Sequence, residues 1–343
     1  MITKKEIGQI KEELVECRNP LFFFHDDPDG LCSFLLLRRF KGEGDWRVIK
    51  TTPHITEEFS RFVSEEHDKV FILDIALVDQ EFVDKIKKPV VWIDHHMPQK
   101  ISKAKYFNPR IKNPDEYISV SAICYEVAGQ DILIAALGAI ADYSMPSFFN
   151  DFAEKYPELV GKAKDIEKIL YETKIGELIK IFAFSLKGKS NDIKKAVNII
   201  RKIKEPEELL SPKNSDARWV VKRYGGINEE YQGLLSEAMK QKYGDILIFL
   251  YQEKKYSFTG DVINELTHRI PGKKIYITGR EKSGYMRISM RSRKINLLPI
   301  LNKALEQVEG FGGGHPQACG ASIKKKDFER FLELIEEYSE KGL

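Results

Sequence analysis

The feature that most constrains the fold is a repeated change from short apolar runs to acidic residues and histidines. Three such runs are FFFHDDPDG at 22–30, VFILDIAL at 70–77 and VVWIDHH at 90–96. Each apolar run is rich in β-branched or aromatic residues and has the length of one buried strand. Helical patterns at 31–40 and 79–87 lie between the runs. This alternation is typical of βαβ units and predicts an α/β fold with a mainly parallel sheet.

The polar residues that end these runs are expected to meet at one edge of the sheet. In open α/β sheets, ligands bind in the crevice outside the carboxyl ends of the strands. A fourth acid, in LGAIADY, follows later in the chain. Several carboxylates and imidazoles cannot share a pocket at low cost unless cations neutralise them. The sequence therefore predicts a hydrolase with two metal ions, and the candidate residues are His25, Asp27, Asp29, Asp74, Asp94, His95, His96 and Asp142.

Some of these residues have a structural explanation when each is considered alone. Asp27 and Asp29 lie in Asp-Pro-Asp-Gly, which is a good turn sequence. An acid at the end of a strand, such as Asp74, usually caps a helix. The Asp-His-His triplet that begins at Asp94 is harder to explain as core packing. The chain has only seven histidines, and two of them stand side by side next to an acid. Imidazole suits manganese, zinc and iron, whereas the surplus of carboxylates favours manganese or magnesium.

The composition along the chain predicts three segments. Residues 1–149 carry the α/β pattern, and residues 150–241 are highly charged and helical. Residues 242–343 return to short strands and helices, which indicates a smaller α/β domain with a mixed sheet. The helical segment is interpreted as a connector or as a surface for a protein partner.

A glycine-rich segment at 310–320, GFGGGHPQACG, is predicted to be a phosphate-binding loop. Backbone N–H groups of such glycines can bind an anion, and a histidine adds a donor. An arginine in ISMRSRK can hold a phosphate with two parallel N–H groups, which lysine cannot do. A structural turn would explain the glycines alone. The candidate substrate-binding residues are Arg291, Ser292, Gly312, Gly313, Gly314 and His315.

Bulk properties argue against a membrane protein and against a disulfide framework. Hydrophobic residues make up 42% and charged residues 31% of the chain, as in soluble globular proteins. The net charge of +3 neither requires nor excludes nucleic acid. The four cysteines lack C-x-x-C spacing and are expected to be buried thiols. No run reaches the ~18 apolar residues of a membrane span. We expect a soluble, cytoplasmic protein.

The order of these motifs resembles that of the DHH phosphoesterase family, which is named for the Asp-His-His triplet. HDDPDG, FILD, DHH and GAIAD occur in that order, and GFGGGH and the SMRS stretch resemble the DHH-associated domain. The resemblance covers roughly 20–145 and 245–343. It implies two Mn²⁺ ions, with Mg²⁺ as an alternative, bound by His25, Asp27, Asp29, Asp74, His95 and Asp142. It also implies a bridging role for Asp74 and a catalytic group of Asp74, Asp94, His95 and His96.

Within the family, the chain resembles the RecJ-like proteins of archaea. Small-substrate members usually carry His-x-x-x-Asp-x-Asp, whereas this chain has the shorter His25-x-Asp27-x-Asp29-Gly30. This resemblance implies an exonuclease that releases mononucleotides from single-stranded DNA or RNA, with a slight preference for 3′-to-5′ polarity. The alternatives are a nanoRNase or pAp phosphatase, and a non-catalytic partner of a replication complex. A helicase, a replication or repair protein, and a second copy of the chain are the protein partners considered.

Overall fold

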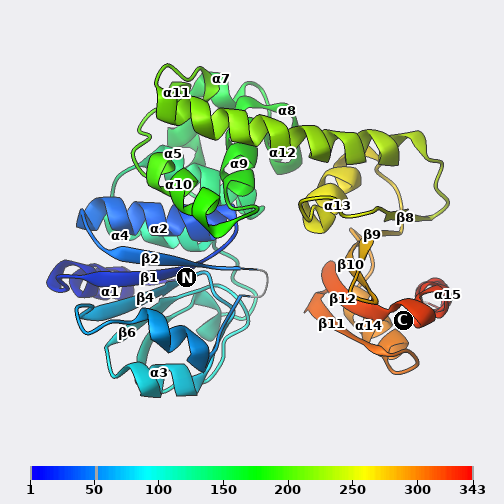
Figure 1. Cartoon of the computed structure of the whole chain (residues 1–343), viewed down its shortest axis with the longest axis horizontal. Helices are drawn as coiled ribbons and strands as arrows, with labels where there is room; N and C mark the ends of the chain where they lie inside the picture. Colours follow the sequence, from blue (N-terminus) through cyan, green and yellow to red (C-terminus); the bar gives the residue numbers. More distant parts are fainter. Residues whose placement is uncertain (1, 51–52, 342–343) are drawn as a thin grey trace. The chain divides into compact units, whose positions relative to one another are not determined.

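The computed structural model describes residues 2–50 and 53–341. Their contacts divide the chain into two compact units, Met1–Tyr224 and Gly225–Leu343 (Figure 1). The division lies inside helix α12 (Ser215–Lys240), so the predicted helical segment contributes to both units. The domain limits at 149 and 241 remain predictions.

The first unit is built around a parallel sheet of five strands, which confirms the predicted fold class. The strands at the centre of the sheet are buried along their whole length, because both faces are covered. Across the sheet the order is β2 (Asp45–Ile49), β1 (Pro20–His25), β4 (Lys69–Leu73), β6 (Val90–Ile93) and β7 (Ala104–Phe107).

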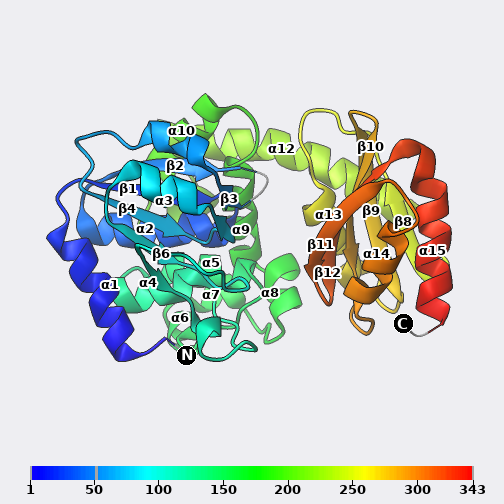
Figure 2. The same ribbon diagram turned by 90° about the horizontal axis from the view of Figure 1, so that it is seen from below.

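The alternating side chains of β1 explain why both faces of the sheet are covered. Phe22 and Phe24 point to one face and join the core that includes α2 (Pro28–Lys41), with Phe24 stacked on Phe34 at 4.7 Å. Phe23 points to the opposite face and packs against Phe82 of α3. Figures 1 and 2 show the two layers of helices on either side of the sheet. The covering elements are α3 (Gln80–Ile86), η1 (Glu57–Phe62), α1 (Lys4–Glu16), α4 (Val120–Ala128) and α5 (Ile132–Ala141).

The charged middle of the chain forms further helices, as predicted. The helix α9 (Lys174–Ser185) packs on α5 and α2 and so joins these helices to the core of the sheet domain. The remaining elements of this unit are α6 (Phe149–Lys155), α7 (Pro157–Val160), α8 (Ile166–Glu172), α10 (Ser190–Ile200), α11 (Glu207–Leu210), η2 (Pro109–Ile111) and the short parallel pair β3 (His54–Ile55) and β5 (Leu77–Val78).

The second unit contains the predicted mixed sheet. One pair of strands is parallel and the other pairs are antiparallel. The order is β11 (Gly310–His315), β12 (Ala318–Lys324), β10 (Tyr285–Arg291), β9 (Ile275–Lys282) and β8 (Ile246–Leu250). The helices of this unit are α13 (Thr259–Arg269), α14 (Leu297–Leu305), α15 (Phe328–Glu340) and η3 (Lys325–Asp327).

The glycine-rich segment differs from the prediction, because it is a strand and not a loop. Residues Gly310–His315 form β11, which pairs with β12 at the edge of the sheet. Glycine at 312 permits this close pairing, since a Cβ there would lie 2.7 Å from the Cβ of Ala321. Strand pairing across the chain therefore overrides the local tendency of glycines to form a turn.

Two predictions from composition can also be compared with the fold. All four cysteines are buried and free of disulfides. None of the helices formed by residues 2–50 and 53–341 has the length and apolar character needed to cross a membrane.

Candidate metal centre

The predicted acids and histidines of the first unit lie at the carboxyl edge of the parallel sheet. His25 is the last residue of β1, and Asp74 directly follows β4. Asp27 begins α2, where its Oδ1 accepts a hydrogen bond of 2.9 Å from the backbone N–H of Gly30. Glycine is required there, because a Cβ at residue 30 would lie 2.6 Å from the carbonyl oxygen of His25. The Asp-His-His triplet at Asp94 follows β6, the neighbour of β4.

Three sets of candidate ligand atoms form at this edge, and they share members. Within each set the ligand atoms lie within 4.8 Å of one another. Asp74 belongs to two sets and His95 also belongs to two, so the three sets are one continuous cluster. The sets are Asp74, His95 and His96; His25, Asp27 and Asp74; and Asp29, His95 and Asp142.

Two buried atoms of this cluster indicate that a cation completes it. The Oδ2 of Asp74 and the Nδ1 of His95 are buried and have no hydrogen-bond partner among the described residues. Such buried polar atoms are costly in a native structure unless a ligand or ion pairs with them. Asp74 also adopts a φ of 57°, an uncommon conformation for a residue other than glycine and one that is often found at functional sites. The mixed carboxylate and imidazole donors fit a divalent ion such as Mn²⁺ or Mg²⁺.

The imidazoles partly compensate the acids. The Nδ1 of His25 lies 2.7 Å from Oδ2 of Asp27, and the Nε2 of His95 lies 3.3 Å from Oδ1 of Asp74. Burial alone would lower the pKa of His25 and of His95. The adjacent carboxylates outweigh burial and raise both pKa values well above the usual range. A cation bound here would displace these protons, since it favours the neutral imidazole as a ligand.

Asp29 joins the cluster to helix α4. Its two carboxylate oxygens accept hydrogen bonds from the backbone N–H groups of Val120 at 2.8 Å and Ser121 at 2.9 Å, in the first turn of that helix. Burial, together with the negative charge of Asp74, raises the pKa of Asp29 to about 7. Asp29 therefore holds α4 in position while it faces His95 and Asp142.

Asp94 supports a histidine and is itself fully bonded. Its Oδ1 lies 2.7 Å from the Nδ1 of His96, and its Oδ2 accepts hydrogen bonds of 3.1 Å from both Tyr106 and Asn108. The side chain of Asp94 is completely buried. Carboxylates that hold histidines in this way orient the ring and fix which nitrogen carries the proton. The observed contacts of Asp94 therefore favour support of His96 over direct binding of a metal ion.

Three polar residues near the centre were not identified from the sequence. Tyr106 and Asn108 hold Asp94, as described above, and Tyr117 donates a hydrogen bond of 2.8 Å to Oδ2 of Asp142. Burial, reinforced by Asp142, raises the pKa of Tyr117, so its hydroxyl stays a donor. Tyr106 and Asn108 lie at the carboxyl end of β7, the position that singled out the other candidates. A search of all five strand ends would therefore have found these two.

The predicted substrate-binding residues lie in the second unit and have different surroundings. Arg291 ends β10, and its Nε donates a hydrogen bond of 2.8 Å to Asn264. Ser292 is buried, and its hydroxyl donates to the carbonyl of Lys274 at 2.7 Å. The same oxygen accepts the backbone N–H of Ile295. Ser292 thus holds the turn that follows β10.

The remaining predicted residues lie on the edge strand β11. The segment from Gly312 to Gly314 pairs with β12 on one side only, and His315 is exposed at its end. Phe311 on the same strand is 69% exposed. The free side of an edge strand presents backbone N–H groups. The glycines are therefore available for an anion along a strand edge and not in a loop.

Comparisons with known proteins agree with this architecture. Residues 21–145 match the N-terminal domain of the DHH family, and residues 247–341 match the DHHA1 domain. No curated protein sequence matches the chain.

Solved structures share the fold at low sequence identity. RecJ from Thermus thermophilus in complex with Mn²⁺ is similar, with a TM-score of 0.67, 17% identity, and coverage of 98% of this chain and 54% of that chain. This chain therefore spans about half the length of that RecJ. Exonuclease RecJ bound to manganese has a TM-score of 0.57, 18% identity, and coverage of 98% and 94%. A pGpG-specific phosphodiesterase from Vibrio cholerae has a TM-score of 0.51, 13% identity, and coverage of 93% and 98%.

The matched domains account for both ends of the chain, and the first of them contains the complete cluster of acids and histidines. The chain belongs to the DHH family of metal-dependent phosphoesterases, with an N-terminal DHH domain and a C-terminal DHHA1 domain.

Proposed function

We propose that the protein is an exonuclease that uses divalent metal ions to release mononucleotides from single-stranded DNA or RNA. The observation that carries the proposal is the position of Asp74, which belongs to two ligand sets and has a buried oxygen without a hydrogen-bond partner among the described residues. Two metal ions in such a site supply an activated water and neutralise charge on the phosphate. The ligands proposed for Mn²⁺ or Mg²⁺ are His25, Asp27, Asp29, Asp74, His95 and Asp142.

His96 is the residue we assign to the phosphate itself. Asp94 accepts from the Nδ1 of this ring and so leaves its Nε2 available for a substrate oxygen. Because the Asp94 side chain is fully buried and bonded to Asn108, the ring of His96 is held in one orientation. Positioning of this kind lowers the cost of ordering the substrate before the reaction.

The choice of a single strand rests on the second unit and on the similar structures. Arg291 and the edge of β11 provide donors for phosphate groups, and the exposed ring of Phe311 can stack on a base. Two of the similar structures are RecJ proteins, and both were solved with manganese. We favour 3′-to-5′ polarity slightly. A helicase, a replication or repair protein, and a second copy of the chain are the partners we propose.

A phosphodiesterase for short substrates, such as a nanoRNase or a pAp phosphatase, is the second candidate. The similarity to the pGpG-specific phosphodiesterase favours it, because the two chains cover 93% and 98% of each other. A substrate of two nucleotides would need contacts only close to the metal centre.

The two candidates are separated by substrate length. The purified protein is incubated with Mn²⁺ and a single strand of about 20 nucleotides, labelled at the 5′ end in one sample and at the 3′ end in another. The exonuclease proposal predicts progressive shortening from one end, which also gives the polarity. Cleavage of a dinucleotide with the long strand intact would replace it with the second candidate. Asp74→Asn serves as the inactive control.

A further inference from the structure

The polar face of α10 carries positive charge in a regular stripe. On the helix, three of these side chains follow the first by three, four and seven residues, so the four lie on one side of it, and one more lysine follows just beyond the end of the helix. The opposite side is buried through Ile193, Val197 and Ile200. We refer to this set as the α10 stripe, and it consists of Asn191, Lys194, Lys195, Asn198 and Lys202.

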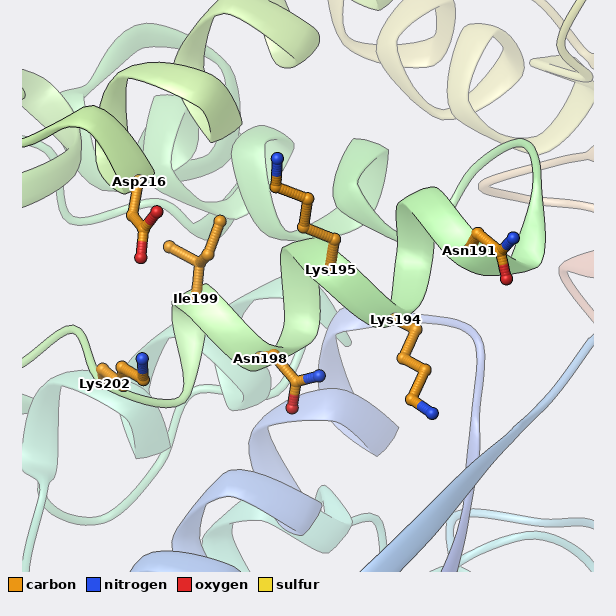
Figure 3. A pocket seen from close by; sticks show the side chains of 7 residues that line it. All are labelled: Asn191, Lys194, Lys195, Asn198, Ile199, Lys202 and Asp216. Carbon is orange, nitrogen blue, oxygen red and sulfur yellow. The ribbon is translucent and has the colours of Figure 1, made fainter.

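The stripe lines a shallow surface groove of about 460 Å³. Figure 3 shows Lys194 and Asn198 on one side of the helix and Lys195 turned toward the start of α12, where Asp216 lies. Lys195 lies over the ring of Trp219, with its Nζ 4.3 Å from the ring centroid. Three lysines therefore share the groove with one carboxylate.

The lysines of the stripe differ from Lys69 and Lys105 in their partners. Within the described part of the chain, no ion pair joins Lys194, Lys195 or Lys202 to a carboxylate. By contrast, Lys69 and Lys105 both pair with Glu13. Three lysines that no carboxylate pairs, in a groove with a single acid, raise the local positive potential, which attracts polyanions.

Two contacts fix the direction of the stripe relative to the metal centre. At the start of α10, the carbonyl of Gly188 accepts a hydrogen bond of 3.0 Å from Lys50, which follows β2 at the carboxyl edge of the sheet. At the other end, Arg39 near the end of α2 donates to the carbonyl of Ile200 at 3.1 Å. Because α2 begins at the metal centre, α10 runs beside it and away from that edge. The 11 residues of α10 extend about 16 Å from its start.

We propose that the α10 stripe is a binding site for the phosphate backbone of a single-stranded nucleic acid, outside the metal centre. This inference rests on the proposed nuclease function and adds a second contact for the part of the strand that is not being cleaved. Lysines supply the charge, the amides of Asn191 and Asn198 supply further donors, and Trp219 is the aromatic residue next to Lys195. A groove that tracks a backbone in this way needs no sequence preference.

The test changes the charge of the stripe and leaves the metal centre intact. The variant Lys194→Gln, Lys195→Gln, Lys202→Gln removes three charges from exposed side chains. The matched control is Lys4→Gln, Lys5→Gln, Lys11→Gln on α1, which also removes three charges from exposed side chains. It is matched further because Lys11 lies over the ring of Phe40, as Lys195 does over Trp219.

With Mn²⁺, kcat/KM is measured for a 20-nucleotide thymidine strand and for its dinucleotide. Binding of the 20-mer is measured by fluorescence anisotropy between 50 and 300 mM KCl, with Asp74→Asn added to each protein to prevent cleavage.

The stripe variant is expected to lose about tenfold in kcat/KM on the 20-mer and nothing on the dinucleotide. The slope of log K against log salt should fall by about 2, because each lost contact to a single strand contributes about 0.7. The control variant should behave as the wild type. Unchanged cleavage and binding of the 20-mer by the stripe variant would overturn the inference and leave the nuclease function standing. In that case the lysines of the stripe would either be solvated without binding a partner or bind an acidic protein surface.

Two further outcomes separate this inference from the function on which it rests. An equal loss on the dinucleotide and the 20-mer would also overturn it, because the substitutions would then be acting on the metal centre. If the wild type cleaves only the dinucleotide, the nuclease function itself fails and the stripe has no strand to bind.

Discussion

The first unit contains two groups of buried charge that are built in opposite ways. Glu13 on α1 accepts from Lys69 at 2.5 Å and also from Lys105, so each charge has a partner within the protein. In the metal centre the Oδ2 of Asp74 and the Nδ1 of His95 are buried but have no hydrogen-bond partner among the described residues. Their ionic contacts, to His25 and to Asp142, are longer, at 3.6 and 3.5 Å. A charge cluster satisfied by its own side chains stabilises the fold. A cluster in which buried atoms are left without hydrogen bonds is arranged for a ligand.

The largest expected effect comes from Asp74→Asn, which removes the acid shared by two ligand sets. We expect a loss in kcat of about 10³-fold or more, because charge stabilisation at the phosphate depends on both ions. Mn²⁺ should raise the unfolding free energy of the wild type by about 2.7 kcal/mol per site at 100 times its Kd. In the variant this increase should be smaller. The measurements are a cleavage assay and thermal unfolding with Mn²⁺ or with EDTA.

A variant that is as active and as strongly stabilised by Mn²⁺ as the wild type would show that Asp74 is structural, like Glu13. The comparison between the two clusters would then be wrong.

The second prediction concerns Glu13→Gln, which leaves the buried ammonium group of Lys69 without its carboxylate. The Lys69 side chain is 10% exposed, whereas Lys105 is 63% exposed and can return to water. We therefore expect a loss of about 3 kcal/mol in unfolding free energy, due mostly to Lys69. Stabilisation by Mn²⁺ should remain. Urea unfolding with and without Mn²⁺ measures the unfolding free energy and its increase on metal binding. If Glu13→Gln also abolished the increase with Mn²⁺, the two clusters would not be independent of each other.

The pH dependence of this loss follows from the pKa of Glu13. Burial raises the pKa, but hydrogen bonds from Lys105 and Lys69 outweigh burial and lower it below its usual value. A carboxyl whose pKa is lowered by folding stabilises the protein above its unfolded pKa, and the contribution is lost as the pH falls through the folded pKa. The difference in stability between wild type and Glu13→Gln should be constant near neutral pH and shrink below about pH 4.3. A difference that grows on acidification would contradict this assignment.

The third prediction tests how the metal centre is supported. Asn108→Ala removes hydrogen bonds of 3.1 Å to Asp94 and 3.0 Å to the carbonyl of His96. Asp94 in turn holds the ring of His96, which we assign to the phosphate, so this ring should be positioned less well in the variant. We expect about a tenfold loss in kcat/KM in the cleavage assay with Mn²⁺. Tyr106→Phe, which removes only one hydroxyl from Asp94, should give a smaller loss than Asn108→Ala. A larger loss would show that Tyr106 supports Asp94 more strongly than Asn108 does.

The smallest effect is expected for Ser292→Ala in the second unit. Its hydroxyl is buried and donates to Lys274, so its loss should cost about 1–2 kcal/mol in stability. We expect kcat/KM to stay within about twofold of the wild type. Its neighbour Arg291 is the contrasting case, because Arg291→Lys should raise KM and leave stability almost unchanged. If Ser292→Ala raised KM as much as Arg291→Lys, Ser292 would be a substrate-binding residue after all.

The sequence by itself determined the parallel sheet and the positions of the acids and histidines on it. Apolar runs such as VFIL and VVWI are local, and their length and composition are enough to predict buried strands. Once the strands are parallel, the residues that follow them must lie at one edge. His25, Asp74 and the triplet at Asp94 could therefore be placed together without knowledge of any contact.

Only the tertiary structure decided what each of these residues does. Asp29 is bonded to Val120, 91 residues away, and Asp94 to Asn108, 14 residues away. At such separations, no local pattern in the sequence shows which residue bonds to which. The same holds for Gly312, whose strand pairing with Ala321 replaced the expected loop, and for the α10 stripe, whose direction depends on contacts with β2 and α2. Local sequence sets which elements form, and packing between distant elements sets which charges are satisfied and which remain for a ligand.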